Sequence, residues 1–246
     1  MKKFIKEQLE DYKVLLRSIP SLFVSLYVVS IIVMNIAANK SINTGLSWLA
    51  LDCGFTVSWM SFLTMDTITK RFGPRAATKL SILGVGINLL CCLIFFAISK
   101  IPGNWGEYYT FNEDIVNNAL NNTFGGSWYV VFGSMTAFLT SAIVNNFLNG
   151  FIGSRLKNNN FRSFAIRSYI STAVGQFVDN FVFALVVSYV LFGWSMTQVI
   201  FCSLTGMLVE LICEVIFSPI GYKVVNQWEV DKVGQSYIDS HKKGAN

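Results

Sequence analysis

Charged residues are scarce in this chain of 246 residues, because only 13% of them are Asp, Glu, Lys or Arg. A soluble globular domain carries roughly a quarter, whereas 53% of this sequence is hydrophobic and its mean hydropathy is +0.50. The shortage of charge excludes an ordinary soluble domain. The formal net charge of +5 does not indicate a nucleic-acid partner, because the basic residues lie in short clusters between apolar runs.

Metal-binding and catalytic motifs are lacking as well. The only histidine, His241, lies in the polar C-terminal segment, and none of the five cysteines forms a C-x-x-C pair. Each cysteine falls inside an apolar run, where it can serve as a small packing residue. The sequence has no G-x-x-x-x-G-K-[ST] motif for phosphate binding. We therefore expect no metal, no cofactor and no enzymatic activity.

Long apolar runs dominate what is present. A helix needs about 20 apolar residues to cross a hydrocarbon core of about 30 Å. Six runs of this kind are found, at Ile19–Ala38, Leu46–Met65, Leu80–Ile98, Trp128–Ile152, Ser168–Phe192 and Thr197–Ile220. They predict an all-α, polytopic membrane protein with six transmembrane helices. We expect it to be a multi-pass protein of the cell inner (plasma) membrane.

The basic residues predict the orientation of these helices. All of the 19 Lys and Arg residues except Lys40 and Lys100 fall on one side of the six-helix arrangement. The positive-inside rule then places both termini in the cytoplasm. Residues 1–18 form an N-terminal arm, either an amphipathic surface helix or a solvated segment. Residues 19–222 form the transmembrane domain, and residues 223–246 a polar cytoplasmic tail. Residues 99–127 lie outside, as a lid or a passive loop.

Asp179 is the one charged residue in the apolar run from Ser168 to Gly193. An ionisable group at bilayer depth is costly, and it usually faces a bundle interior or a watery cavity. Thr172 and Gln176 precede Asp179 at helical spacing, so the three side chains share one face. This polar stripe inside a membrane helix indicates a transport path.

Two further runs carry acidic residues. Asp52, Thr56, Trp59 and Asp66 recur at helical spacing in the second run, which predicts a shared helix face. Asp66 is either an ion-pair partner of Lys70, four residues later, or an anchor at the inner rim.

Glu210 and Glu214 stack on one face of the sixth run together with Ser203. Two nearby carboxylates in a medium of low dielectric constant do not both ionise easily. We therefore expect Glu210 and Glu214 to couple transport to an ion. Pro219 and Gly221 weaken the inner end of this helix.

Amide side chains gather in two other runs. The fourth run ends with Ser141, Asn145, Asn146 and Asn149, and the first ends with Asn35, Ala38 and Asn39. Amides in a membrane need polar partners, so they face protein or water. Helix–helix adhesion and substrate contact both explain them.

Three segments resemble the vitamin uptake transporter (VUT) family, the queuosine-precursor transporters. The first runs from Met65 to Ala77 and contains the acidic-to-basic turn Asp66–Lys70 and Gly73. The second, Ser171 to Phe183, contains Gly175 and Asp179, and the third contains Pro219 in the last helix. The resemblance extends over the whole six-helix layout.

The resemblance implies import of 7-deazaguanine compounds, either queuosine precursors or queuine, by symport. A carboxylate can accept both adjacent donors of a guanine-like edge, and Asp179 suits that role. Gln176 or Asn146 can donate a hydrogen bond to the acceptor of that edge, and an aromatic ring can stack on the base. Glu210 can pair with an amine of the ligand. The predicted substrate-binding residues are Asp179, Gln176, Asn180, Asn146, Asn149, Glu210, Trp59 and Asn39. The chain departs from the family pattern at Asn149 and Glu210, where members carry an acidic residue and a lysine.

Three hypotheses remain open from the sequence. The first is a stand-alone secondary transporter, and the second is the membrane-embedded binding subunit of an energy-coupling-factor importer. The third is a membrane scaffold without a ligand. We expect a small-molecule substrate and membrane lipid as partners, and we expect no nucleic acid. The sequence leaves a homo-oligomer open.

Overall fold

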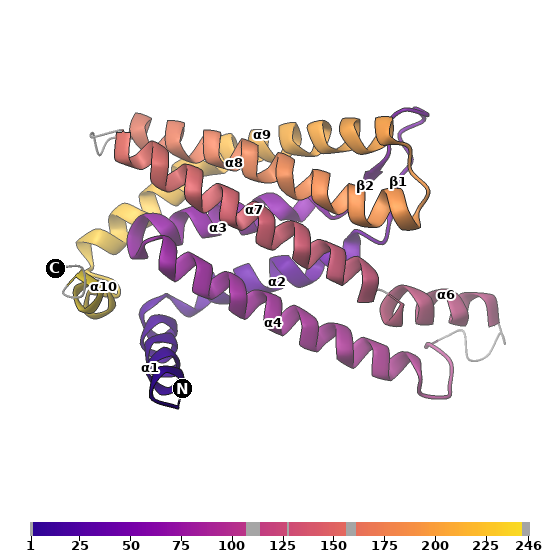
Figure 1. Ribbon diagram of the computed structural model, residues 1–246, viewed down its shortest axis with the longest axis horizontal. Coiled ribbons are helices and arrows are strands. Elements are labelled where there is room, and N and C mark those ends of the chain that lie inside the picture. Colours follow the sequence, from indigo (N-terminus) through magenta and orange to yellow (C-terminus); the bar gives the residue numbers. More distant parts are fainter. Residues whose placement is uncertain (1, 107–113, 127, 156–160, 243–246) are drawn as a thin grey trace.

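The computed structural model describes residues 2–106, 114–126, 128–155 and 161–242. Long helices lie side by side in a bundle, and both ends of the chain lie at the same end of that bundle (Figure 1). The elements in chain order are α1 (Lys2–Ser18), α2 (Ser21–Ala37), β1 (Ser41–Ile42), β2 (Leu51–Asp52), α3 (Phe55–Phe72), α4 (Pro74–Ser99), α6 (Asp114–Gly125), α7 (Trp128–Arg155), α8 (Phe161–Phe183), the π-helix η1 (Ala184–Tyr189), α9 (Met196–Val230) and α10 (Gln235–Lys242).

Four helical segments among the described residues are long and apolar enough to span a membrane. They are Pro74–Ser99, Asp114–Asn145, Tyr169–Tyr189 and Met196–Val230. A fifth candidate combines α1 with α2, which meet at an angle of 106° just before Pro20 and Ser21. The prediction of a helical, multi-pass membrane protein is therefore confirmed.

The helix predicted over residues 46–65 is wrong in its first half. Residues 41–54 instead form a short antiparallel hairpin, in which Ser41 pairs with Asp52 and Ile42 with Leu51. Polar and small residues in this stretch favour turns over a helix, and α3 begins only at Phe55. Asp52 consequently lies on a strand and does not share a helix face with Thr56 or Asp66. The hairpin lies at the end of the bundle opposite the termini (Figure 1).

Gly73 separates α3 from α4. Its φ of 89° lies in the region that favours glycine, and Pro74 follows as the first residue of α4. Proline suits this position because the first helical N–H has no intrahelical partner. The Gly73–Pro74 step thus ends one helix and starts the next without a loop.

The C-terminal part of α9 continues past the predicted end of the transmembrane domain. Pro219 lies within the helix without ending it, although proline leaves the carbonyl four residues earlier without its usual donor. The Ser218 hydroxyl donates to that carbonyl, the oxygen of Val215, at 3.3 Å. Beyond Tyr222, where a polar tail was expected, α9 runs on to Val230 and buries Trp228.

The two terminal segments pack together at their end of the bundle. Asp11 of α1 contacts Lys79 of α4 and also His241 of α10 at 3.1 Å. The Arg71 guanidinium donates to the carbonyl oxygen of Val233 at 2.9 and 3.1 Å. These contacts join α1 and α10 to the bundle close to the α3–α4 turn.

Candidate functional site

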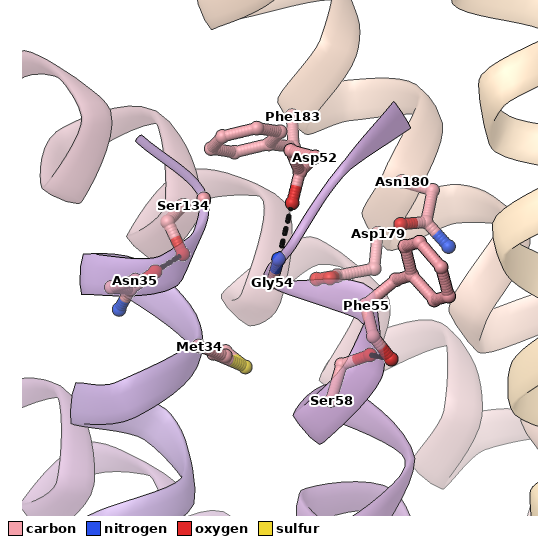
Figure 2. A pocket seen from close by; sticks show the side chains of 11 residues that line it. Met34, Asn35, Asp52, Gly54, Phe55, Ser58, Ser134, Asp179, Asn180 and Phe183 are labelled. Carbon is pink, nitrogen blue, oxygen red and sulfur yellow. Dashed lines mark hydrogen bonds between the residues drawn. The ribbon is translucent and has the colours of Figure 1, made fainter. Parts of the chain in front are cut away.

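A small pocket lies inside the bundle beneath the hairpin. Its walls come from α2, β2, the start of α3, α7 and the end of α8 (Figure 2). It is lined by Met34, Asn35, Ala38, Asp52, Gly54, Phe55, Ser58, Ser134, Asp179, Asn180 and Phe183. Its free space holds about one or two water molecules, so a ligand as large as a heterocyclic base requires the walls to move apart.

Asp179 enters the pocket from α8. Its Oδ1 accepts a hydrogen bond from the Ser141 hydroxyl of α7 at 2.9 Å, and its carboxylate extends toward Gly54 (Figure 2). A carboxylate offers about four acceptor positions, so one serine donor leaves capacity for a ligand. The prediction that Asp179 faces a cavity in the bundle agrees with this placement.

Glu210 lies behind the pocket wall. Its Oε1 accepts from the Ser58 hydroxyl, and its Oε2 accepts from Nδ2 of Asn180 at 3.0 Å. Ser58 and Asn180 both line the pocket, whereas the Glu210 side chain is buried outside it. Any ligand that displaces either donor therefore changes the hydrogen bonding of Glu210.

A second polar cluster surrounds Asp66. Its carboxylate accepts from the Thr172 hydroxyl at 3.1 Å and faces the Asn145 amide at 3.5 Å. Gly175 allows α8 to approach α7 here, since a Cβ on Gly175 would lie 3.0 Å from the Cβ of Asn145. The Asp66–Lys70 ion pair stays a prediction.

Gln176 lies one helical turn from Thr172 and one turn from Asn180, on the same stripe of α8. Its side chain is buried, and neither amide atom has a hydrogen-bond partner among the described residues. Buried polar groups are almost always hydrogen-bonded.

Helix α9 contains the sixth apolar run and carries its acidic residues on one face, as their spacing predicts. Ser203, Glu210 and Glu214 are all buried on one face of α9. Gly206 and Ser218 lie on the same face, which lets α9 approach α3 and α8 closely. The two glutamates thus point into the bundle and not toward lipid.

Trp59 and Asn39, two further predicted binding residues, are not among the described residues that line the pocket. The Trp59 ring stacks on Phe217 of α9, with centroids 4.4 Å apart. Asn39 donates to backbone carbonyls of its own helix, at Asn35 and Ile36. The side chains of Asn146 and Asn149 lie outside the described residues. Of the predicted binding set, the structure brings Asp179 and Asn180 to the pocket and Glu210 directly behind it.

Several pocket residues were absent from the predicted site. Asp52 and Phe55 were assigned to a continuous helix, which hid the turn between them. The signal was available in Asp52 and Gly54, because Asp two residues before Gly is typical of a turn closed by the side chain. Here the Gly54 N–H donates to Oδ1 of Asp52 at 2.7 Å. Asn35 and Ser134, which hydrogen-bond each other across α2 and α7, were not singled out as a pair.

The site is built for binding. No group of three or more His, Cys, Asp or Glu side chains in the described ranges is placed to hold a metal ion. The pocket combines carboxylates, amides, hydroxyls and two phenyl rings from elements that all belong to the bundle. Polar groups that converge on one cavity beside apolar side chains are typical of small-molecule recognition.

The fold and this pocket define a class, a helical membrane protein with a central polar site of the kind that carries small molecules. Comparison with known families makes the assignment specific. The model of the family described as "Putative vitamin uptake transporter" matches residues 52–224. The chain therefore belongs to this family of transporters, and its pocket lies largely within the matched region. Comparisons with curated proteins and with solved structures found no match.

The Glu210 network depends on the absence of a side chain at Gly206. A Cβ at this position would lie 2.8 Å from Nδ2 of Asn180, the atom that donates to Glu210. We expect Gly206→Ala to break this bond and to lower stability by about 1–3 kcal/mol, since a buried acceptor loses its donor. Thermal unfolding of the purified protein measures the change.

Gly86→Ala is the matched control for that prediction. Gly86 also lies within a helix, and a Cβ there would meet nothing within 4 Å. Alanine is favoured over glycine in a helix by up to about 1 kcal/mol, so this variant should keep or raise the melting temperature. Equal melting temperatures for both variants would refute the role of Gly206.

Proposed function

We propose that this protein imports queuosine precursors or queuine, which are 7-deazaguanine bases, across the cell inner (plasma) membrane. The observation that carries the proposal is the pocket that is lined by the Asp179 carboxylate together with the phenyl rings of Phe55 and Phe183. The family match supports a transporter of the vitamin-uptake type. The substrate class comes from the resemblance of the motif around Asp179 to the queuosine-precursor transporters, and the polar groups of the pocket are compatible with it.

A guanine-like edge presents adjacent N–H donors that match a carboxylate. Asp179 keeps acceptor capacity beyond its bond from Ser141, so it can accept both donors. Asn35 accepts from Ser134 through its Oδ1, and its amide nitrogen can then donate to the acceptor of the ligand. Phe55 and Phe183 supply apolar faces for a planar heterocycle. These groups together distinguish a purine-like base from an anionic vitamin.

Exchange of the Asp179 carboxylate for an amide tests this role. Asp179→Asn keeps the volume but places a donor against a ligand donor, so a charge-assisted bond is lost. The expected cost is about 2–4 kcal/mol, or roughly 30- to 1,000-fold in affinity for a 7-deazaguanine. Calorimetry on purified protein measures it, with Asp239→Asn on the exposed face of α10 as the control. Undiminished binding by a folded Asp179→Asn protein would remove Asp179 from the site.

The proposed topology has six membrane helices with both termini in the cytoplasm. We assign the spans to α2, α3, α4, α7, α8 with η1, and α9, which lie side by side in the bundle (Figure 1). The termini lie at one end and the hairpin, α6 and Lys100 at the other. This arrangement agrees with the distribution of the basic residues, which the positive-inside rule places on the cytoplasmic side. The pocket then lies toward the outer side.

Cysteine labelling tests the topology in a background whose native cysteines are replaced. Arg75→Cys and Asn104→Cys introduce exposed positions at opposite ends of the bundle. A membrane-impermeant maleimide applied to intact cells should label only the cysteine at 104, and both after permeabilisation. Labelling of the cysteine at 75 in intact cells would reverse the proposed orientation.

We propose that a proton drives import and is carried by the Glu210–Glu214 pair. Both side chains are buried on the same face of α9, and low-dielectric burial disfavours charging both at once. Asn180 links the two processes, because it lines the pocket and also donates to Glu210. Ligand binding and protonation of Glu210 therefore both involve the Asn180 amide.

Transport assays test this coupling. Uptake should fall when a protonophore collapses the gradient, and Glu210→Gln should bind ligand but no longer concentrate it. Glu229→Gln, on an exposed part of α9, should behave like the wild type. Full, protonophore-insensitive uptake by Glu210→Gln would contradict the mechanism. A strict requirement for a copurifying ATPase would favour the energy-coupling-factor alternative.

A further inference from the structure

Two carboxylates face the pocket, and they come from different elements. Asp179 belongs to α8, whereas Asp52 belongs to β2 of the hairpin, and both line the same cavity (Figure 2). None of the described lining residues is Lys, Arg or His. Glu210, which the sequence analysis offered as the partner of a ligand amine, lies behind the wall with hydrogen bonds to both oxygens. The second carboxylate available to a ligand is therefore Asp52.

The hairpin holds Asp52 in place without neutralising it. Its Oδ1 accepts from the Gly54 N–H at 2.7 Å, within the turn that leads into α3. A backbone amide is a dipole without net charge, so it orients the carboxylate but does not take the place of a cationic partner. Phe183 lines the same pocket as Asp52 (Figure 2). A cavity with two acidic groups and aromatic walls attracts positive charge.

We propose that Asp52 is the residue that makes the pocket selective for a cationic ligand. The ligand class is a planar heterocycle that carries a protonated amine, with its ring edge on Asp179 and its amine on Asp52. A neutral ligand of the same shape leaves the two carboxylates facing each other without a counter-charge, which is costly in a low-dielectric site. The inference rests on the proposed function for the identity of the heterocycle. It adds the charge of the ligand and the residue that recognises this charge.

A matched ligand pair tests the proposal. The probes are a 7-deazaguanine with a 7-aminomethyl group and its 7-hydroxymethyl analogue, which have similar shapes but differ in charge. Calorimetry on the purified wild-type protein should show at least about tenfold tighter binding of the amine, because hydrogen bonds to charged groups are the stronger ones. Asp52→Asn should weaken the amine by at least about tenfold and the hydroxymethyl analogue by less than about threefold.

The asparagine variant preserves the local fold. The side-chain oxygen of asparagine can still accept from the Gly54 N–H, so the turn at the start of α3 keeps its hydrogen bond. Asp52→Glu, which keeps the charge, should retain part of the preference for the amine, and Asp239→Asn should retain all of it. Size-exclusion profiles and melting temperatures establish that each variant is folded.

The outcomes separate this inference from the proposed function. If both deazaguanines bind the wild type equally, or if Asp52→Asn keeps the preference, Asp52 does not select charge and the inference is overturned while the substrate class stands. If neither binds, the substrate class is wrong, and benzylamine against benzyl alcohol then decides the role of Asp52. A preference for benzylamine that Asp52→Asn abolishes supports the inference, and equal or absent binding of both overturns it.

Discussion

Buried carboxylates inside an apolar bundle are the constraint on which the structure depends. A carboxylate away from water needs donors from its surroundings, or it must carry a proton or meet a cation. Asp66, Asp179 and Glu210 each accept from a neighbouring helix, through Thr172, Ser141 and Asn180 respectively. These bonds connect α3 to α8, α8 to α7 and α9 to α8. The buried carboxylates thus also hold the helices in register.

Close packing of the helices makes these bonds possible. Gly175 and Gly206 lie directly against Asn145 and Asn180, the two amides that serve the carboxylates. Small residues let helices in a membrane approach closely, where dispersion and hydrogen bonding replace the hydrophobic effect as the source of association. The π-helix η1 follows the segment that carries Asp179 and Phe183. Such local departures from α-helical geometry are frequent at functional sites.

The sequence predicted the helical class and the main polar faces because helical periodicity is a strong signal. Asp179 with Thr172 and Gln176, and Glu210 with Glu214, each lie on the face that their spacing indicates. The hairpin could not be read from hydropathy, since Leu46, Trp48 and Leu49 extend the apolar run into α3. Turn formation at Asp52 depends on one side-chain hydrogen bond, which a window average does not detect.

The composition of the pocket was the least predictable part. Asn35, Ser58 and Ser134 are ordinary polar residues in their own helices, and only packing of α2, α3 and α7 brings them together. Their roles depend on contacts between residues far apart in the chain, such as Ser58 with Glu210 and Ser134 with Asn35. A single sequence contains no record of such contacts. The same limit explains why Glu210 was placed in the pocket rather than behind its wall.

The measurement that most directly tests this account is an experimental structure of the protein with a bound 7-deazaguanine. The account predicts ligand density in the pocket beneath the hairpin, with the ring edge on Asp179 and the ring between Phe55 and Phe183. A separate crevice lies between α2, α4, α6 and α7, and its lining includes Asn88 and Phe124. Ligand bound in that crevice, with the Asp179 pocket empty, would contradict the account.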